Sequence, residues 1–455
     1  MARCGELEFV EEDDEYAKLV RRMNPPSVVI DNDSCDGATV IRVDRVKKHG
    51  ILLEAVQVLV DLNLVITKAY ISSDGNWFMD VFNVTDQDGN KVQNKEVTDF
   101  IKKCLESEDY LLPPPATAPP SEATFVELTG VDRPGLLSEV CAVMASLSCN
   151  IVNAEVWTHD GRAAAVVHIT DGSTGLPVRD AARLSHLQEL LSTVMHGDGA
   201  ADGNGRSAVS LGGGDNAERR LHRMMMLDGG EVGKNNKKGR KNNKVVVMDC
   251  RERDYTVVMV RCGDRPRLLF DTLCALADLG YVVFHGTVDA EAGATKDAYQ
   301  EYYVRHVDGH PVRCDAERLR LVRCLEAAVE RRASDGLELE VKTEDRAGLL
   351  SEITRVLREN SLSIIRAVIT TKDGEADDTF YVSDAYGNPV DGKAAMDALG
   401  DQLGHAVLRV KTNGRAAAAA VKPPEGGGGG GGAASIIGNF LKGSFQGFRL
   451  IRSYS

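Results

Sequence analysis

The feature that most constrains the fold is an eight-residue segment, the octet, that the chain repeats. Residues 132–139 read DRPGLLSE, and residues 345–352 read DRAGLLSE. Two weaker copies, DRPRLLFD and KKHGILLE, occupy residues 264–271 and 47–54. A segment that recurs along a chain predicts a fold built from repeated structural units.

Each octet lies between an apolar run and an amphipathic pattern. After the second octet the apolar residues fall on one face of a helix, namely Leu136, Leu137, Val140, Met144 and Leu147. Asp132 and Pro134 suit the first turn of that helix, and Gly135 allows a close approach of the backbone. The octet therefore predicts a strand-to-helix turn with outward N–H groups. Such a turn either binds a carboxylate or phosphate, or does no more than begin the helix.

The elements after each octet follow one order. In the second repeat we expect strands at 151–157 and 163–169, a helix at 178–195 and a last strand at 207–211. Four copies of a β-α-β-β-α-β unit describe the chain, which predicts an α+β fold with antiparallel sheets. The fourth repeat has a last strand at 406–411, whereas the first and third show none. We therefore expect repeat 1 to pair with repeat 2, and repeat 3 with repeat 4.

The expected domain organisation follows from these repeats and from the composition between them. We expect an acidic N-terminal segment at 1–37, four domains at 38–113, 123–211, 254–333 and 337–412, a flexible Gly/Asn/Lys linker with a short helix at 212–253, and a Gly-rich tether with a basic, apolar tail at 413–455. Proteolysis in the linker should then release two stable halves, 38–211 and 245–412.

Composition narrows the class of protein. The net charge of −14 argues against a nucleic-acid-coating surface. The ten cysteines are scattered without a CxxC pair, which indicates reduced thiols in an intracellular protein, in the cytoplasm, the nucleus or both. No apolar run is long enough to span a bilayer. The basic run at 234–244 is either a patch for nuclear import or polyanion binding or, as we favour, a solvated linker.

Catalytic and metal-binding patterns are weak. His159 and Asp160 lie in an expected hairpin turn, and His306 and His310 flank another turn, so neither pair predicts a catalytic or metal site. We therefore expect no enzyme activity, no metal and no cofactor.

Together these features resemble the ACT domain, and four copies resemble the plant ACT-domain-repeat (ACR) proteins. The resemblance rests on residues 132–137 and 345–350, on YVVFHGTV at 281–288, and on the ending IRSYS at 451–455. It implies ferredoxin-like sandwiches whose sheets pair side by side. It also implies amino-acid binding at the paired interface, beside the turn before the first helix, and no catalytic domain.

The resemblance places ligand-binding residues in the second and fourth repeats. They are Asp132, Gly135, Leu136, Asn150, Asp345, Gly348, Leu349 and Ser363. In the third repeat Arg267 replaces the glycine and Val282 the polar strand residue. The arginine either fills the pocket or clamps a carboxylate. The first repeat has Lys47 and Val65 at the aspartate and polar positions, so we expect repeats 1 and 3 to be structural partners.

Three functions remain open from the sequence. The favoured one is a regulatory sensor of free amino acids, which acts on a protein partner or associates with itself through its sheets. The second is an interaction scaffold that no longer binds a ligand. The third is a uridylyltransferase-like enzyme, for which the chain lacks the paired-carboxylate metal site. A rise in melting temperature with an amino acid would favour the sensor over the scaffold.

Overall fold

The structure is a computed structural model. It describes residues 26–46, 50–74, 77–107, 124–196, 206–211, 216–227, 244–250, 252–290, 297–333, 336–403 and 407–411. The acidic run, the proline-rich spacer, most of the basic run and the C-terminal tail lie outside these ranges. None of the described helices combines the length and the apolar character needed to cross a membrane.

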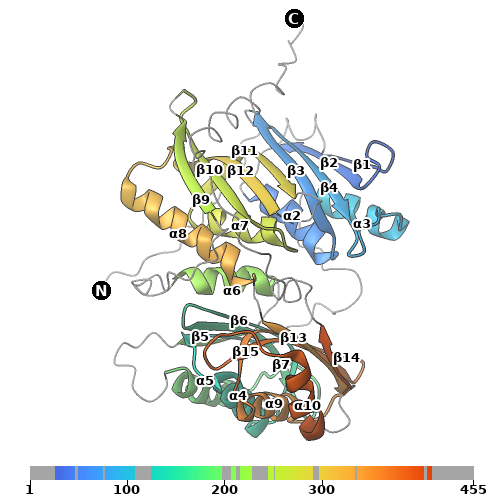
Figure 1. The fold of residues 1–455 in the computed structure, drawn as a ribbon, viewed down its shortest axis with the longest axis vertical. Coiled ribbons are helices and arrows are strands. Elements are labelled where there is room, and N and C mark those ends of the chain that lie inside the picture. Colours follow the sequence, from blue (N-terminus) through green and yellow to red (C-terminus); the bar gives the residue numbers. More distant parts are fainter. Residues whose placement is uncertain are drawn as a thin grey trace, which may run out of the picture. The chain divides into compact units, whose positions relative to one another are not determined.

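Repeats 1 and 3 share one antiparallel sheet of eight strands (Figure 1). Its strands are β1 (Ser27–Asp31), β2 (Thr39–Val46), β3 (Val65–Asp74), β4 (Trp77–Thr85), β9 (Lys244–Cys250), β10 (Tyr255–Gly263), β11 (Tyr281–Ala290) and β12 (Asp297–His306). They lie in the order β1-β2-β4-β3-β11-β12-β10-β9. The two repeats join where β3 pairs with β11, from Lys68 opposite Asp289 to Ser72 opposite His285.

Repeats 2 and 4 share a second sheet of the same design. Its strands are β5 (Thr124–Val131), β6 (Cys149–His159), β7 (Arg162–Asp171), β8 (Arg206–Leu211), β13 (Leu337–Glu344), β14 (Leu362–Lys372), β15 (Glu375–Asp384) and β16 (Val407–Lys411). They lie in the order β16-β13-β15-β14-β6-β7-β5-β8. The join is between β6 and β14, from Asn153 opposite Thr370 to Trp157 opposite Arg366.

Two helices from each repeat pack on its sheet. The helices of repeats 1 and 3 are α2 (Ile51–Asp61), α3 (Lys95–Glu106), α7 (Leu268–Asp278) and α8 (Asp315–Arg331), and those of repeats 2 and 4 are α4 (Leu136–Ser146), α5 (Ala181–His196), α9 (Leu349–Glu359) and α10 (Gly392–Leu403). Each pair of repeats buries one continuous apolar core between sheet and helices. The α+β, ferredoxin-like prediction with paired antiparallel sheets is confirmed.

The expected pairing of the repeats is wrong. Repeat 1 pairs with repeat 3, and repeat 2 with repeat 4. Repeats 1 and 3 do have a fourth strand, but β1 and β9 come before the first strand of the unit rather than after its second helix. The edge of β2 or β10 accepts a strand from either direction along the chain, so the missing last strand carried no information about partners.

This pairing corrects the expected domain boundaries and the expected products of proteolysis. Because β1 and β9 belong to the sheets, repeats 1 and 3 begin before residues 38 and 254. Each proposed proteolytic half would hold one repeat from each sheet and would leave the joining strands β3, β6, β11 and β14 without their partners. Release of two stable halves is therefore no longer expected.

The short helix expected in the linker is present as α6 (Ala217–Leu227), but it is packed rather than flexible. Leu221, Met224 and Met225 form a buried cluster with Trp157 and with Ala164 and Val166 of β7. Arg162 donates hydrogen bonds to the backbone carbonyls of Met225 and Met224, at 3.1 and 3.5 Å. The apolar side chains of α6 decide its position, although polar residues flank it in the sequence.

Candidate ligand cavity between repeats 2 and 4

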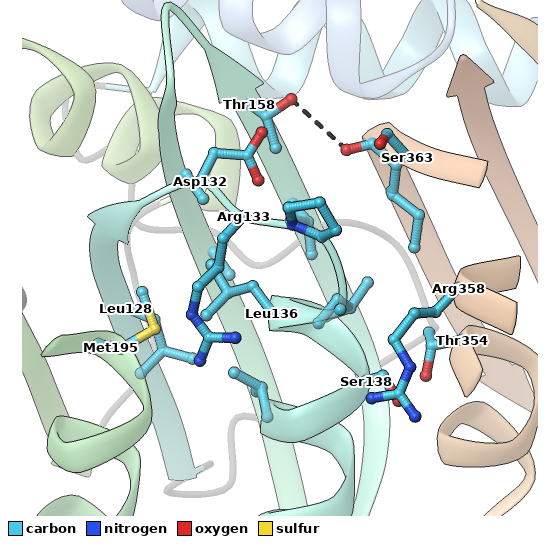
Figure 2. Close-up of a pocket in the computed structure, with 18 of the residues that line it drawn as sticks. Leu128, Asp132, Arg133, Leu136, Ser138, Thr158, Met195, Thr354, Arg358 and Ser363 are labelled. Atoms are coloured by element: carbon cyan, nitrogen blue, oxygen red, sulfur yellow. Dashed lines mark hydrogen bonds between the residues drawn. The ribbon is translucent and has the colours of Figure 1, made fainter. Parts of the chain in front are cut away.

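A cavity of about 180 Å³ lies beside the second octet. Repeat 2 supplies the turn at 132–135, the start of α4 and parts of β5, β6 and β7, and repeat 4 supplies α9 and the start of β14 (Figure 2). The cavity therefore exists only because these two repeats share a sheet.

The turn is held in place by the adjacent hairpin. The backbone N–H of Asp132 donates to the carbonyl of Gly161, at 2.8 Å, and that of Leu136 donates to the carbonyl of Arg133, at 3.1 Å. Gly135 adopts a left-handed φ of 86° immediately before α4, a conformation that glycine takes without strain. No side chain caps this helix start, so the N–H groups that follow that of Leu136 have no capping side chain.

The octet arginine has a structural role. Arg133 donates to the Glu139 carboxylate, at 2.8 Å, and to the backbone carbonyl of Val194 at the end of α5, at 3.1 Å. Arg265 of repeat 3 makes the same two kinds of contact, to Asp271 and to the last turn of α8. This side chain therefore fixes the turn to both helices of its own repeat.

Asp132 and Arg358 both line the cavity, are exposed to solvent and carry opposite charges. Asp132 keeps solvent contact, yet the protein around it raises the pKa of its carboxyl group, and the backbone N–H of Arg133 partly offsets this. Arg358 extends from α9 toward the start of α4, where its guanidinium lies near Ser138 and Thr354 (Figure 2). A Cβ atom on residue 135 would lie only 2.6 Å from its Cδ atom, so glycine permits this approach.

The guanidinium of Arg358 makes no hydrogen bond or ion pair with another residue in the described ranges. The hydrogen bond from Arg133 lowers the pKa of Glu139, and the positive charge of Arg358 adds to this effect. Arg358 is thus an exposed cation beside a cavity, available for an external carboxylate.

The structure brings half of the predicted ligand-binding residues together. Asp132, Gly135, Leu136 and Ser363 all line the cavity. Asn150, Asp345, Gly348 and Leu349 do not line it. The reason is geometric: the strand that faces the octet turn comes from the partner repeat, so Ser363 of repeat 4, and not Asn150, lies opposite the turn of repeat 2.

Arg358 is a residue that sequence reasoning missed. It lies ten residues after the octet glycine of repeat 4. The same position holds Val60, Ala145 and Ala277 in repeats 1, 2 and 3. Aligning the four repeats through their first helices would have singled out this arginine, but a helical surface position in one repeat gives no sign of which turn it faces.

Ala165 is a second missed residue, and it helps to explain why the cavity is open. Ala165 of β7 is paired with Leu128 of the neighbouring strand β5, and it lines the cavity. The register of the other repeats places Asp80, Gln300 and Asp378 at this buried position. Burial raises the pKa of both Asp80 and Asp378 to about 7.

At the turn of repeat 3, Arg267 clamps a carboxylate of its own chain. Its guanidinium forms an ion pair with Glu218 of α6, which is also bound by Arg332 at 3.0 Å. Here Val60 and Gln300 leave a space of only about 30 Å³. Of the two readings of this arginine, the structure supports the clamp.

A buried ionic cluster continues from this turn. Asp271 has no exposed surface and binds Arg332 and Arg265, each at 2.6 Å, and His222 of α6, at 2.8 Å. Burial opposes ionisation of Asp271, but the charges of Arg332 and Arg265 outweigh it and hold its pKa well below the usual range. Burial lowers the pKa of His222 to about 4. This turn is a joint between α6 and repeat 3.

Within the described ranges, no three or more His, Cys, Asp and Glu side chains gather as metal ligands do. The cavity lining also contains no histidine and no cysteine. The chemistry that the site offers is the binding of charged and apolar groups.

Comparisons with known proteins agree with this architecture. Residues 34–111 match the family model described as the ACR family N-terminal ACT domain, and residues 124–183 and 338–399 match the ACT domain. The ACT domain-containing protein ACR6 of Arabidopsis thaliana is 53% identical over 405 residues, which cover 88% of this chain and 92% of that protein. ACR4 of the same plant is 50% identical over 452 residues, which cover 97% of this chain and 98% of that protein.

Proposed function

Because this chain belongs to the ACR family of ACT domain-containing proteins, we propose that it is a non-catalytic regulatory protein that binds a free amino acid between repeats 2 and 4. Binding would bias the protein toward a state that a protein partner, or a second copy of the chain, recognises. Neither the ligand nor the partner is named by the family.

The observation that carries the proposal is the presence of opposite charges, Asp132 and Arg358, in the lining of one cavity. An amino acid presents a carboxylate and an ammonium group on one carbon. The guanidinium of Arg358 suits the carboxylate, and the carboxylate of Asp132 suits the ammonium group. The uncapped start of α4, after Leu136, would add backbone N–H groups that favour a carboxylate.

The ion pair at the turn of repeat 3 supports this assignment. There the chain places an arginine and a carboxylate together, Arg267 with Glu218, at the same structural turn. At the turn of repeat 2 the arginine is Arg358 of the partner repeat, and no carboxylate of the described residues binds it. An external carboxylate would restore the same contact.

The lining residues also support a binding role rather than catalysis. Thr158 donates its hydroxyl to the backbone carbonyls of Ile364 and Ile365, at 3.5 and 3.0 Å, and so joins the two repeats. Thr354 donates to the carbonyl of Leu350, at 2.7 Å. Both hydroxyl groups are therefore engaged in structural hydrogen bonds to backbone carbonyls.

Calorimetric titration of the full chain with amino acids tests the proposal. Arg358→Ala should weaken binding about 10- to 100-fold, because it removes charge-assisted hydrogen bonds. Arg355→Ala is the matched control: it lies one turn earlier on α9, binds Glu359, and does not line the cavity. Equal affinities for both variants, or no binding by the unmodified chain, would rule out the site.

A further inference from the structure

We infer that the ligand has an aliphatic side chain of three or four non-hydrogen atoms, as valine, leucine, isoleucine and methionine do. This inference rests on the proposed function and deepens it. It names the class of amino acid that the cavity takes and the residue that most restricts this class, Ala165.

The cavity is lined by buried apolar side chains together with the hydroxyl groups of Ser138, Thr158, Thr354 and Ser363. Its buried aliphatic side chains are Leu128, Leu136, Val140, Val156 and Met195. An aliphatic group placed among them is removed from water, which favours its binding. Among these apolar side chains an amide or hydroxyl of the ligand would lose hydrogen bonds to water. The hydroxyl groups of Thr158 and Thr354 already donate to backbone carbonyls, which disfavours glutamine, asparagine and serine as ligands.

The charged residues that line the cavity are already assigned. Asp132 and Arg358 face the groups common to all amino acids, and Arg133 is bound to Glu139 and to the carbonyl of Val194. A ligand carboxylate or ammonium on the side chain would therefore meet no spare counter-charge among the described lining residues. This disfavours aspartate, glutamate, lysine and arginine.

The size of the cavity sets the length of the side chain. An engineered protein cavity of about 150 Å³ admits benzene, a group of six carbon atoms. The present cavity of about 180 Å³ must also hold the α-carbon. This leaves room for an isobutyl group and excludes an indole ring.

Ala165 sets this limit. In repeat 3 the equivalent residue is Gln300, and the space beside that turn is only about 30 Å³. In repeats 1 and 4 the position holds a buried aspartate. Repeat 2 alone combines a small residue here with the glycine turn and the opposing arginine, so the side chain of the ligand extends toward Ala165.

A titration panel on the full chain tests the ligand class. Leucine, isoleucine, valine and methionine should bind, and alanine should bind at least about tenfold more weakly for each methylene it lacks. Glutamine, aspartate, lysine or phenylalanine binding as tightly as leucine would overturn the inference while the proposed site stands. Binding of none of these amino acids would overturn the proposed function as well.

Two variants test the cavity wall. Ala165→Gln copies repeat 3 and should abolish leucine binding, whereas Gln300→Ala, the equivalent position in the other pair, should leave leucine affinity unchanged. If Ala165→Gln does not fold, Met195→Ala decides: it enlarges the cavity and should shift the affinity ratio of phenylalanine to leucine by about tenfold or more toward phenylalanine. An unchanged ratio would contradict the inference.

Discussion

The turns of repeats 2 and 3 begin with the same three residues, Asp-Arg-Pro, and have different roles in the folded protein. Around Asp132 the turn borders a cavity of about 180 Å³, and a partner arginine lies across it unpaired among the described residues. Around Asp264 the corresponding space is about 30 Å³, and the arginine lies in the turn itself and is paired with Glu218. Both turns precede a helix that packs in a shared core.

The difference shows that the octet specifies the local structure and not the function. Three residues that differ between the repeats keep the cavity of repeat 2 open. They are Gly135 in the octet, Arg358 in α9 of repeat 4, and Ala165 in β7. Where these become arginine, valine and glutamine, as in repeat 3, the turn is filled and serves as a joint with α6.

The largest expected effect tests the joint. Asp271→Asn leaves Arg265 and Arg332 buried without their carboxylate, and should lower the free energy of unfolding by about 3–5 kcal/mol. Urea unfolding followed by circular dichroism measures this loss. Glu352→Gln, at the same octet position of repeat 4, breaks a largely solvent-accessible pair with Arg346 and should cost no more than about 1 kcal/mol. Similar costs for both would show that the two turns do not differ in this way.

How far the sequence predicts this molecule depends on which interactions are local. The helix after each octet, the hairpin at Asp160 and the short helix α6 follow from patterns within a few residues, and they are where the sequence places them. Pairing of the repeats depends on backbone hydrogen bonds between strands more than two hundred residues apart, such as β6 with β14, and no local pattern records them.

The site was predictable on the same terms. Asp132, Gly135 and Leu136 lie within one octet, so the turn could be identified from sequence. Arg358 comes from the other repeat, and its position opposite Gly135 is a consequence of the pairing. A prediction that pairs repeat 2 with repeat 1 cannot place this arginine at the cavity, because Arg358 belongs to repeat 4.

A second prediction concerns Asp378 of β15 and the pH dependence of stability. The pKa of Asp378 is raised to about 7 by burial, so the folded protein holds its proton between about pH 4 and 7, where the unfolded chain has released it. Stability from this group is therefore lost as pH rises toward 7. Asp378→Asn should stabilise the protein by roughly 2–4 kcal/mol at pH 8 and have little effect at pH 4.

Unfolding midpoints at several pH values measure this effect. Repeat 2 has Ala165 at the position equivalent to Asp378, so the pH dependence expected here is a property of repeat 4 that the cavity side of the sheet does not share. A stability difference between Asp378→Asn and the unmodified chain that does not change with pH would contradict the assignment of a buried, neutral Asp378.

The smallest effect separates two glycines that share a backbone conformation. Gly135 and Gly348 have φ values of 86° and 80°, so alanine at either should cost about 1 kcal/mol of stability. A Cβ atom at residue 135 would also displace Arg358, whereas one at residue 348 would meet no atom within 4 Å. Only Gly135→Ala should therefore weaken leucine binding, by several-fold, in calorimetric titration. Equal weakening by both variants would show that the approach of Arg358 does not matter.

The stoichiometry of amino-acid binding to the full chain tests the central claim most directly. If only the turn of repeat 2 combines a glycine, an opposing arginine and an open wall, calorimetric titration with leucine should give one site per chain. Arg358→Ala should remove that site, and Arg355→Ala should keep it. Two or more equivalent sites per chain, or a single site that survives Arg358→Ala, would contradict the account.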